Sequence, residues 1–390
     1  MPFWRPSLVA LCVAATATLP LLGCGGGDDA AQSAQEPPVA QAATDPMPQG
    51  TAPPNPDPAN VYATTGAGML APRAEGVPYR LYVPNSESDT VDVIDPDKEE
   101  VVRSFAVGGL PQHVVPSHDM KTLYVNSNQG NTLTAIDPAT TKPAPNPIPV
   151  EDPYNLYFTP DGGSAIVVAE RLQRLDFRDP ETMKLQDELE VPCEGVNHMD
   201  FAADGSYLIA SCEFAGAMIK VDLERRKLVE TLALPNLDGM PQDVKMSPDG
   251  KVFYVADMAS NGLWEIDPER FKVIDFLPTG EGAHGLYPSR DGTKMYASNR
   301  DEGTISVIDF ATREVVDKWA IPGGGSPDMG GVSPDGEMLW LTGRYNSEVY
   351  GFDTGSGELS ARIPVGAGPH GMAVWPQPGR YSLGHTGNMR

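Results

Sequence analysis

The sequence predicts an all-β protein, a seven-bladed β-propeller made of four-stranded blades. Three observations favour this fold: a strand-and-turn unit recurs along the chain, the unit is about 42 to 45 residues long, and it recurs seven times. The segments "MSPDGKVFYV" at 246–255 and "VSPDGEMLWL" at 332–341 are two copies of its first half. Units of this length, each with four short strands, are typical of propeller blades.

Each unit contains an alternating strand, a "PDG"-type turn, a strand such as "YVAD", a polar loop, a strand ending in "ID" and a last strand such as "EVVRSF". The turn sequence suits a tight connection, because Asp can bond the turn backbone and Gly accepts a positive φ. The third strands end at aspartates whose spacings are 42, 39, 46, 45, 42 and 44 residues, namely Asp95, Asp137, Asp176, Asp222, Asp267, Asp309 and Asp353.

The two ends of the repeat region complement each other. The first group, "LYVPNSESDTVDVIDPDKEEVVRSF" at 81–105, has three strands and lacks the strand that should precede them. The last group, "HGMAVWPQPG" at 370–379, has that first strand and nothing after it. We therefore expect the C-terminal strand to pair with the N-terminal three strands, which closes the ring and removes an open sheet edge.

The repeats resemble those of the YVTN β-propeller family, which includes YncE-like extracytoplasmic proteins. The tetrapeptide that names the family is degenerate here, as "YVPN" at 82–85, "YVNS" at 124–127, "YVAD" at 254–257 and "YASN" at 296–299. The resemblance extends from about residue 79 to 377. It implies the propeller fold but leaves the function open, because relatives include surface-layer proteins, binding proteins and haem-carrying or lactone-cleaving propellers.

The N-terminus has the features of an export signal. Residues 1–23 combine a positive Arg5 with an apolar run at 8–22, which is shorter than the ~20 residues of a spanning helix. The run ends in "LLGC" at 21–24, which resembles a bacterial lipobox and implies that Cys24 is lipidated; an ordinary secretory signal is the alternative. We expect an extracytoplasmic lipoprotein that is tethered to a membrane, in the periplasm or at the cell surface.

The composition predicts a disordered linker before the propeller and makes nucleic acid a poor partner. Residues 24–77 are rich in Ala, Pro and Gln, which predicts a disordered linker, followed by the propeller at 78–379 and a C-terminal tail at 380–390. The formal net charge of −25 repels phosphate backbones, so nucleic acid is a poor partner. We expect a monomer that binds a small molecule or a protein.

A propeller would gather polar side chains at one mouth of its channel, where first strands begin and second strands end. The starts of the first strands supply His113, Asn155, His198, Asp243, His284, Asp328 and His370. The ends of the second strands add Glu170, Glu213, Arg300 and Arg344. Such a set suits ligand binding, although water-compatible lining of a channel needs the same residue types. His118 and His385 lie outside this set and are expected to face solvent.

The same residues could bind a metal ion. His113, His198 and Asp243 have ligand chemistry suited to Zn²⁺ or Cu²⁺, but no short motif supports a site, and the ligands would come from separate blades. Cofactors are therefore left open, with a divalent metal as one option. Cys193 and Cys212 could form a disulfide, remain free thiols or join a metal site.

The sequence favours a binding or interaction module over an enzyme. It has no G-x-S-x-G, P-loop or dinucleotide-binding motif. The alternative is a metal-dependent, lactonase-like hydrolase that would use the same channel mouth.

Overall fold

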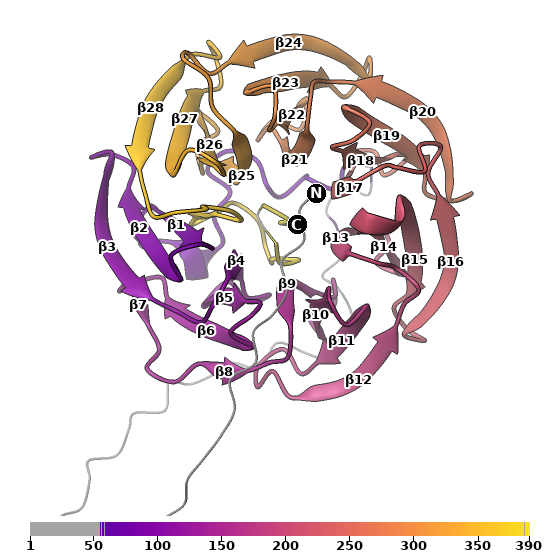
Figure 1. The fold of residues 1–390 in the computed structure, drawn as a ribbon, viewed down its shortest axis with the longest axis horizontal. Coiled ribbons are helices and arrows are strands. Elements are labelled where there is room, and N and C mark those ends of the chain that lie inside the picture. Colours follow the sequence, from indigo (N-terminus) through magenta and orange to yellow (C-terminus); the bar gives the residue numbers. More distant parts are fainter. Residues whose placement is uncertain (1–54, 56, 58, 386) are drawn as a thin grey trace, which may run out of the picture. The chain divides into compact units, whose positions relative to one another are not determined.

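The structure, a computed structural model, describes residues 55, 57, 59–385 and 387–390. Seven antiparallel sheets form a ring, which Figure 1 shows along its axis. Six sheets have four strands, and in the seventh two short strands, β7 (Lys142–Pro143) and β8 (Ile148–Pro149), take the place of the outermost strand. The predicted seven-bladed all-β propeller is confirmed. The predicted signal peptide, Cys24 and most of the linker lie outside the described residues. Within the described part, no helix combines the length and apolar character needed to cross a membrane.

Each blade places its strands at four distances from the axis. The innermost strands are β4 (Pro111–Pro116), β9 (Pro153–Phe158), β13 (Val196–Phe201), β17 (Pro241–Met246), β21 (Ala283–Pro288), β25 (Pro327–Val332) and β29 (Ala373–Trp375). The second strands are β5 (Leu123–Ser127), β10 (Ala165–Ala169), β14 (Tyr207–Cys212), β18 (Phe253–Asp257), β22 (Lys294–Asn299), β26 (Met338–Gly343) and β1 (Arg80–Asn85). The third strands are β6 (Thr132–Asp137), β11 (Arg174–Arg178), β15 (Ala217–Asp222), β19 (Gly262–Asp267), β23 (Thr304–Asp309), β27 (Glu348–Asp353) and β2 (Thr90–Asp95).

The outermost strands are β12 (Leu185–Glu190), β16 (Lys227–Ala233), β20 (Lys272–Pro278), β24 (Glu314–Ala320), β28 (Leu359–Pro364), β3 (Glu100–Ala106), and the pair β7 (Lys142–Pro143) and β8 (Ile148–Pro149). The β7–β8 strand is interrupted because "KPAPNPIP" at 142–149 has four prolines, none of which can donate to a sheet ladder. Two short 3₁₀ helices, η1 (Pro72–Ala74) and η2 (Glu213–Ala215), complete the elements.

Burial follows the radial order of the strands. Every residue of innermost strands such as β4 and β9 is buried, whereas all but one residue of the outermost strand β3 is exposed. The core lies between neighbouring blades: Ile209 and Met218 of one blade form one apolar cluster with Val244 and Phe253 of the next. The blades therefore pack face to face, and this packing positions the innermost strands around the axis.

The closing blade joins the two ends of the chain as the sequence predicts. Its sheet has the order β29-β1-β2-β3, and β29 pairs with β1 through Leu81 opposite Val374 and Arg80 opposite Trp375. The Trp375 side chain is fully buried. Pairing of the C-terminal strand with the N-terminal three strands is thus confirmed.

The end of the predicted linker belongs to the propeller instead. Val61 donates its backbone N–H to the carbonyl of Pro248, and the Tyr62 hydroxyl donates to the carbonyl of Met246 at 2.7 Å. Both side chains are buried in a core cluster. Residues 59–77 thus lie along the turn face, the side of the ring that carries the "PDG" turns, so the linker prediction is wrong for this stretch. This stretch is ordered although it has few apolar residues, because Val61 and Tyr62 pack against a core that the ring already provides.

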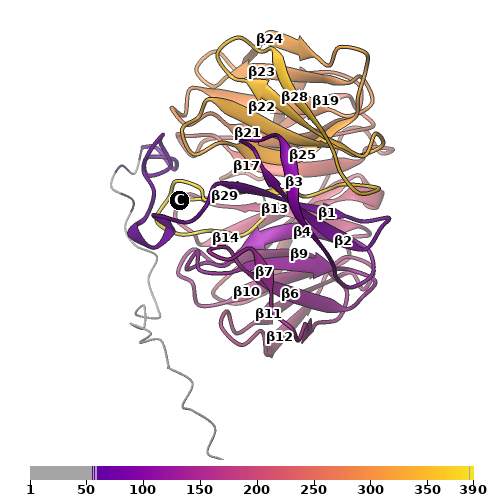
Figure 2. The same ribbon diagram turned by 90° about the vertical axis from the view of Figure 1, so that its left-hand side faces the viewer.

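The C-terminal tail, whose described residues are 380–385 and 387–390, enters the channel from the turn face. Ser382 donates its N–H to the carbonyl of His118, Phe158 of β9 donates to Leu383, and His385 donates to Leu156. Figure 2 shows the C-terminus beside the first described residues, on one side of the blades. The expectation that His118 and His385 face solvent is wrong: His385 is fully buried, and the His118 ring stacks on Tyr381 at 5.0 Å. Backbone groups of the innermost strand β9 face the channel and need hydrogen-bond partners, and the tail provides them.

Cys193 and Cys212 form a disulfide, with their Cα atoms 5.1 Å apart. It joins the loop before β13 to the end of β14 within one blade.

Ring closure can be tested at Trp375. We expect Trp375→Ala to lower the free energy of unfolding by about 3–5 kcal/mol, because it removes a fully buried aromatic side chain from the closing strand. Chemical denaturation measures the change. Val102→Ala on the exposed strand β3 is the control and should change stability by less than about 1 kcal/mol. Equal effects of the two variants would contradict the proposed importance of the closing strand.

Candidate functional site

The innermost strands bring the first-strand residues together on the channel axis. These side chains are all buried: His113, Asn155, His198, Asp243, His284, Asp328 and His370. They lie near the channel mouth, the face opposite the "PDG" turns. His385 of the tail joins them from the turn face, so five imidazoles gather in one place. No spacing in the sequence pointed to His385, because it lies beyond the last strand of the repeat.

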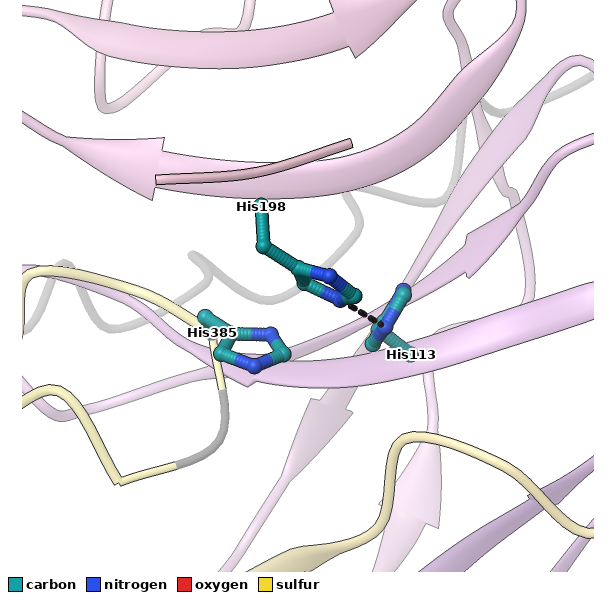
Figure 3. A group of neighbouring side chains, drawn as sticks. All are labelled: His113, His198 and His385. Atoms are coloured by element: carbon teal, nitrogen blue, oxygen red, sulfur yellow. Dashed lines mark hydrogen bonds between the residues drawn. The ribbon is translucent and has the colours of Figure 1, made fainter. Parts of the chain in front are cut away.

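Three of the imidazoles form the central triad, His113, His198 and His385, which Figure 3 shows with their rings side by side. His113 Nε2 and His198 Nε2 lie 3.4 Å apart. One nitrogen of each of the three rings lies within 4.8 Å of the others. The His385 ring centroid lies 4.6 Å from that of His198 and 5.2 Å from that of His113.

The hydrogen bonds of the triad determine where its lone pairs point. His113 Nδ1 lies 2.8 Å from the carbonyl oxygen of Tyr154, which can only accept, so Nδ1 carries the proton and Nε2 the lone pair. That lone pair faces His198 Nε2. His198 Nδ1 is buried and has no hydrogen-bond partner among the residues that the structure describes.

Burial keeps the triad neutral. Desolvation lowers the pKa of His113 to about 4, and the pKa of His198 and of His385 lies well below the usual range for the same reason. Neighbouring imidazoles add to the effect on His198 and His385. Neutral imidazoles are the form in which histidine binds a metal ion.

A second cluster contains His284, Asp328 and His370, with Arg300 beside them. Burial alone would raise the pKa of Asp328, but the Arg300 guanidinium and His284 hold it well below its usual range. Arg300 donates to Asp328 Oδ1 at 2.5 Å and contacts His284, whose Nδ1 lies 3.0 Å from the same oxygen. His370 Nδ1 donates to the carbonyl of Gln112 at 3.1 Å. Because Arg300 already neutralises Asp328, this cluster suits a dication less well than the triad does.

Asp243 lies at the edge of the triad and is already engaged. Its carboxylate accepts hydrogen bonds from the N–H groups of Val244 and Leu286, both at 2.9 Å, and pairs with the buried Lys245 at 3.4 Å. His385 Nε2 lies 3.6 Å from Asp243 Oδ1. The sequence predicted His113, His198 and Asp243 as metal ligands. In the structure His385 lies beside the two predicted imidazoles, and Asp243 lies next to His385.

Two glutamates at the channel mouth, Glu170 and Glu213, are partly buried. Burial raises the pKa of Glu170 to about 8, with a further contribution from Glu213, and burial also raises the pKa of Glu213. Glu213 accepts a hydrogen bond from Asn197 at 2.6 Å. The Arg171 side chain is bound to Asp152 at 2.6 Å, and its charge offsets only part of the rise in the pKa of Glu170. Neither glutamate forms an ion pair with any described residue.

The structure gives Arg344 a structural position. Its guanidinium donates to Ser86 Oγ at 2.9 Å and to the carbonyl of Gly368 at 3.2 Å. These contacts connect the last complete blade to the closing blade. Arg344 also lies close enough to the channel histidines for its charge to lower the pKa of His113, His284 and His370. Asn155 is bound to the tail, since its amide lies 3.0 Å from His385 Nδ1.

Residues 61–378 match the family model described as YNCE-like beta-propeller. The chain belongs to the YNCE-like β-propeller family. This confirms the resemblance seen in the repeats. Antigen Lp49 of Leptospira interrogans is 28% identical over 162 residues, which cover 35% of this chain and 34% of the antigen. The chain thus spans about a third of the length of that relative.

Solved structures show the same fold for this YNCE-like propeller. Hydrazine synthase of Kuenenia stuttgartiensis aligns with a TM-score of 0.62 and 18% identity, covering 79% of this chain and 99% of that chain. A candidate 6-phosphogluconolactonase of Bacteroides uniformis aligns with a TM-score of 0.60 and 17% identity, covering 75% and 98%. At these identities the likeness concerns the fold alone.

Glu170 makes the stability of the protein depend on pH. Its pKa rises on folding from 4.5 to about 8, so the folded state binds more protons in this interval and stability falls as the pH rises through it. We expect Glu170→Gln to raise the free energy of unfolding at pH 8 by about 2 kcal/mol. Each pKa unit corresponds to ~1.4 kcal/mol, and we expect less than the full shift because the carboxyl is partly exposed to water.

Denaturation curves of the Glu170→Gln variant at pH 5 and pH 8 provide the measurement. Glu100→Gln on the exposed strand β3 is the matched control and should leave the pH dependence unchanged. If the Glu170→Gln variant shows the same pH dependence of stability as the wild type, the pKa of Glu170 is not raised on folding.

Proposed function

We propose that this chain is an extracytoplasmic, membrane-tethered binding module that takes up a small cationic ligand at the channel mouth. The observation that carries the proposal is the unpaired glutamates Glu170 and Glu213. Most buried carboxylates elsewhere in the described propeller have a cationic partner, as with Asp152, Asp176 and Glu265. The buried Asp92 and Asp257 have no cation but each accepts several hydrogen bonds. A partly buried acidic pair without a cation is costly for the fold and is typical of a binding site.

The chemistry of the mouth defines the ligand class. A positive charge would stabilise both glutamates in their ionised form and so recover the energy that their burial costs. Asn197 and Gln242 lie beside Glu213 and offer further polar contacts, with Asn197 Oδ1 lacking a partner among the described side chains. An amine or another organic cation of small size fits these groups best.

Binding is favoured over hydrolysis by the state of the channel carboxylates. A lactonase-like metal site would rely on Asp243 and Asp328, and both are already paired with buried cations, Lys245 and Arg300. The likeness to a candidate 6-phosphogluconolactonase concerns the fold. The proposal therefore rests on the glutamates.

Thermal unfolding of the full-length protein with a panel of alkylamines and polyamines tests the binding function. We expect at least one cation to raise the melting temperature in a dose-dependent way and to release protons on binding, because Glu170 ionises when a positive charge approaches. The double variant Glu170→Gln, Glu213→Gln should abolish the response, and Glu100→Gln should retain it. No response to any cation, together with no co-purified adduct in native mass spectra, would overturn the proposal.

The tether is tested at Cys24. We expect the wild-type protein to fractionate with membranes and Cys24→Ser to appear in the soluble fraction, because lipid chains on this cysteine would supply the membrane affinity. Mass spectrometry of the mature N-terminus gives an independent measurement. Recovery of wild-type protein without acyl chains would contradict the lipid anchor.

A further inference from the structure

We propose that His113, His198 and His385 bind one transition-metal ion, Zn²⁺ or Cu²⁺, and that the C-terminal tail supplies the third ligand. This site goes beyond the proposed function, since it uses none of the glutamates at the channel mouth. All three side chains are fully buried at the channel axis. They come from two innermost strands, β4 and β13, and from the tail.

The spacing of the first two ligands fits a metal ion. Two nitrogens bound to one ion at 2.0–2.1 Å in tetrahedral geometry lie roughly 3.3–3.4 Å apart. His113 Nε2 and His198 Nε2 lie 3.4 Å apart. Without an ion the two nitrogens share a long hydrogen bond at this distance (Figure 3). The same separation lets both nitrogens bind one ion without moving the two strands.

The protonation pattern points to the same conclusion. The Tyr154 carbonyl accepts the proton of His113 Nδ1, so the Nε2 lone pair is directed at His198. A backbone carbonyl that orients a histidine through its other nitrogen is a common partner of metal-binding imidazoles. His198 Nδ1 has no hydrogen-bond partner among the described residues, so His198 can carry its proton there and turn an Nε2 lone pair to the same point when a cation is bound.

His385 completes the triad with a small movement. Its ligand nitrogen lies within 4.8 Å of those of His113 and His198, so binding requires a shift of about 1.5 Å or less. The Asn155 amide lies 3.0 Å from Nδ1 and Asp243 Oδ1 lies 3.6 Å from Nε2. The Asn155 amide N–H donates to Nδ1, so Nδ1 carries the lone pair and Nε2 the proton. Nδ1 can bind the ion in place of this hydrogen bond, while Asp243 faces the Nε2 proton and can hold the ring in place.

The donor atoms select the class of metal. Three neutral imidazoles favour Zn²⁺ and Cu²⁺ over Ca²⁺ and Mg²⁺, which prefer oxygen ligands. Because His385 belongs to the tail, an ion held by the triad also holds the tail in the channel. Metal binding and the seating of residues 380–390 are thus coupled.

Metal titration of the full-length, chelator-stripped protein tests the site. Isothermal titration and elemental analysis should show one Zn²⁺ or Cu²⁺ per chain. His113→Gln, His198→Gln and His385→Gln should each weaken binding by at least about 100-fold, beyond the 10–100-fold typical of outer-shell changes. His118→Gln is the matched control, since His118 packs against Tyr381 outside the central group and should retain full affinity.

A second measurement separates loss of a ligand from loss of folding. Electron paramagnetic resonance of the Cu²⁺ form should show nitrogen ligands, with one fewer in folded His385→Gln. Hydrogen exchange of the tail should slow when Zn²⁺ is added to the wild type but not to His113→Gln. The assignment is overturned if no ion binds stoichiometrically, if His118→Gln weakens binding as much as His113→Gln, or if His284→Gln and His370→Gln abolish it while the triad variants do not. Unchanged metal affinity in His385→Gln would contradict the proposal that the tail supplies the third ligand.

The metal site and the proposed ligand site can fail separately. Glu170→Gln with Glu213→Gln should leave metal affinity unchanged within about threefold, because neither glutamate belongs to the triad.

Discussion

Pairing of β29 with β1 is the constraint on which the rest of the molecule depends. This pairing connects the last strand of the chain to the first and holds seven blades in a ring. Once the ring is closed, each innermost strand must begin beside the axis. Residues that are separated by whole blades in the sequence, such as His113 and His198, then come into contact. The composition of the channel thus follows from the closure of the ring.

Burial of so many polar groups on one axis requires compensation, and three ion pairs supply much of it. Asp200 pairs with Arg390, Asp243 with Lys245 and Asp328 with Arg300. The histidines between them avoid the cost by remaining neutral. Each of these arrangements lowers the cost of desolvation without a ligand. Glu170 and Glu213 form no ion pair with a described residue, which is why we propose that they, and not the deeper aspartates, are the groups that a ligand would stabilise.

The repeat made the fold and the convergence of the first strands predictable. The "PDG" turns and the spacing of the "ID" corners report local backbone geometry, which short sequences determine directly. The positions of His118, His385 and residues 59–77 depend on a channel and a turn face that exist only after the ring forms. No local pattern marks them. The contacts of Arg344 with Ser86 and Gly368 have no local signal for a related reason: these neighbours come from the closing blade and lie beside Arg344 only in the complete ring.

The closing blade also affects the order in which the protein can mature. Its paired residues lie about 300 positions apart, so the closing strand is synthesised long after the three strands that it completes. Pairing over such a separation is slow to form. A nascent chain therefore lacks the strand that locks it, and it stays open for longer than a protein built from local contacts. One blade therefore lacks its innermost strand until residues 373–375 have been made.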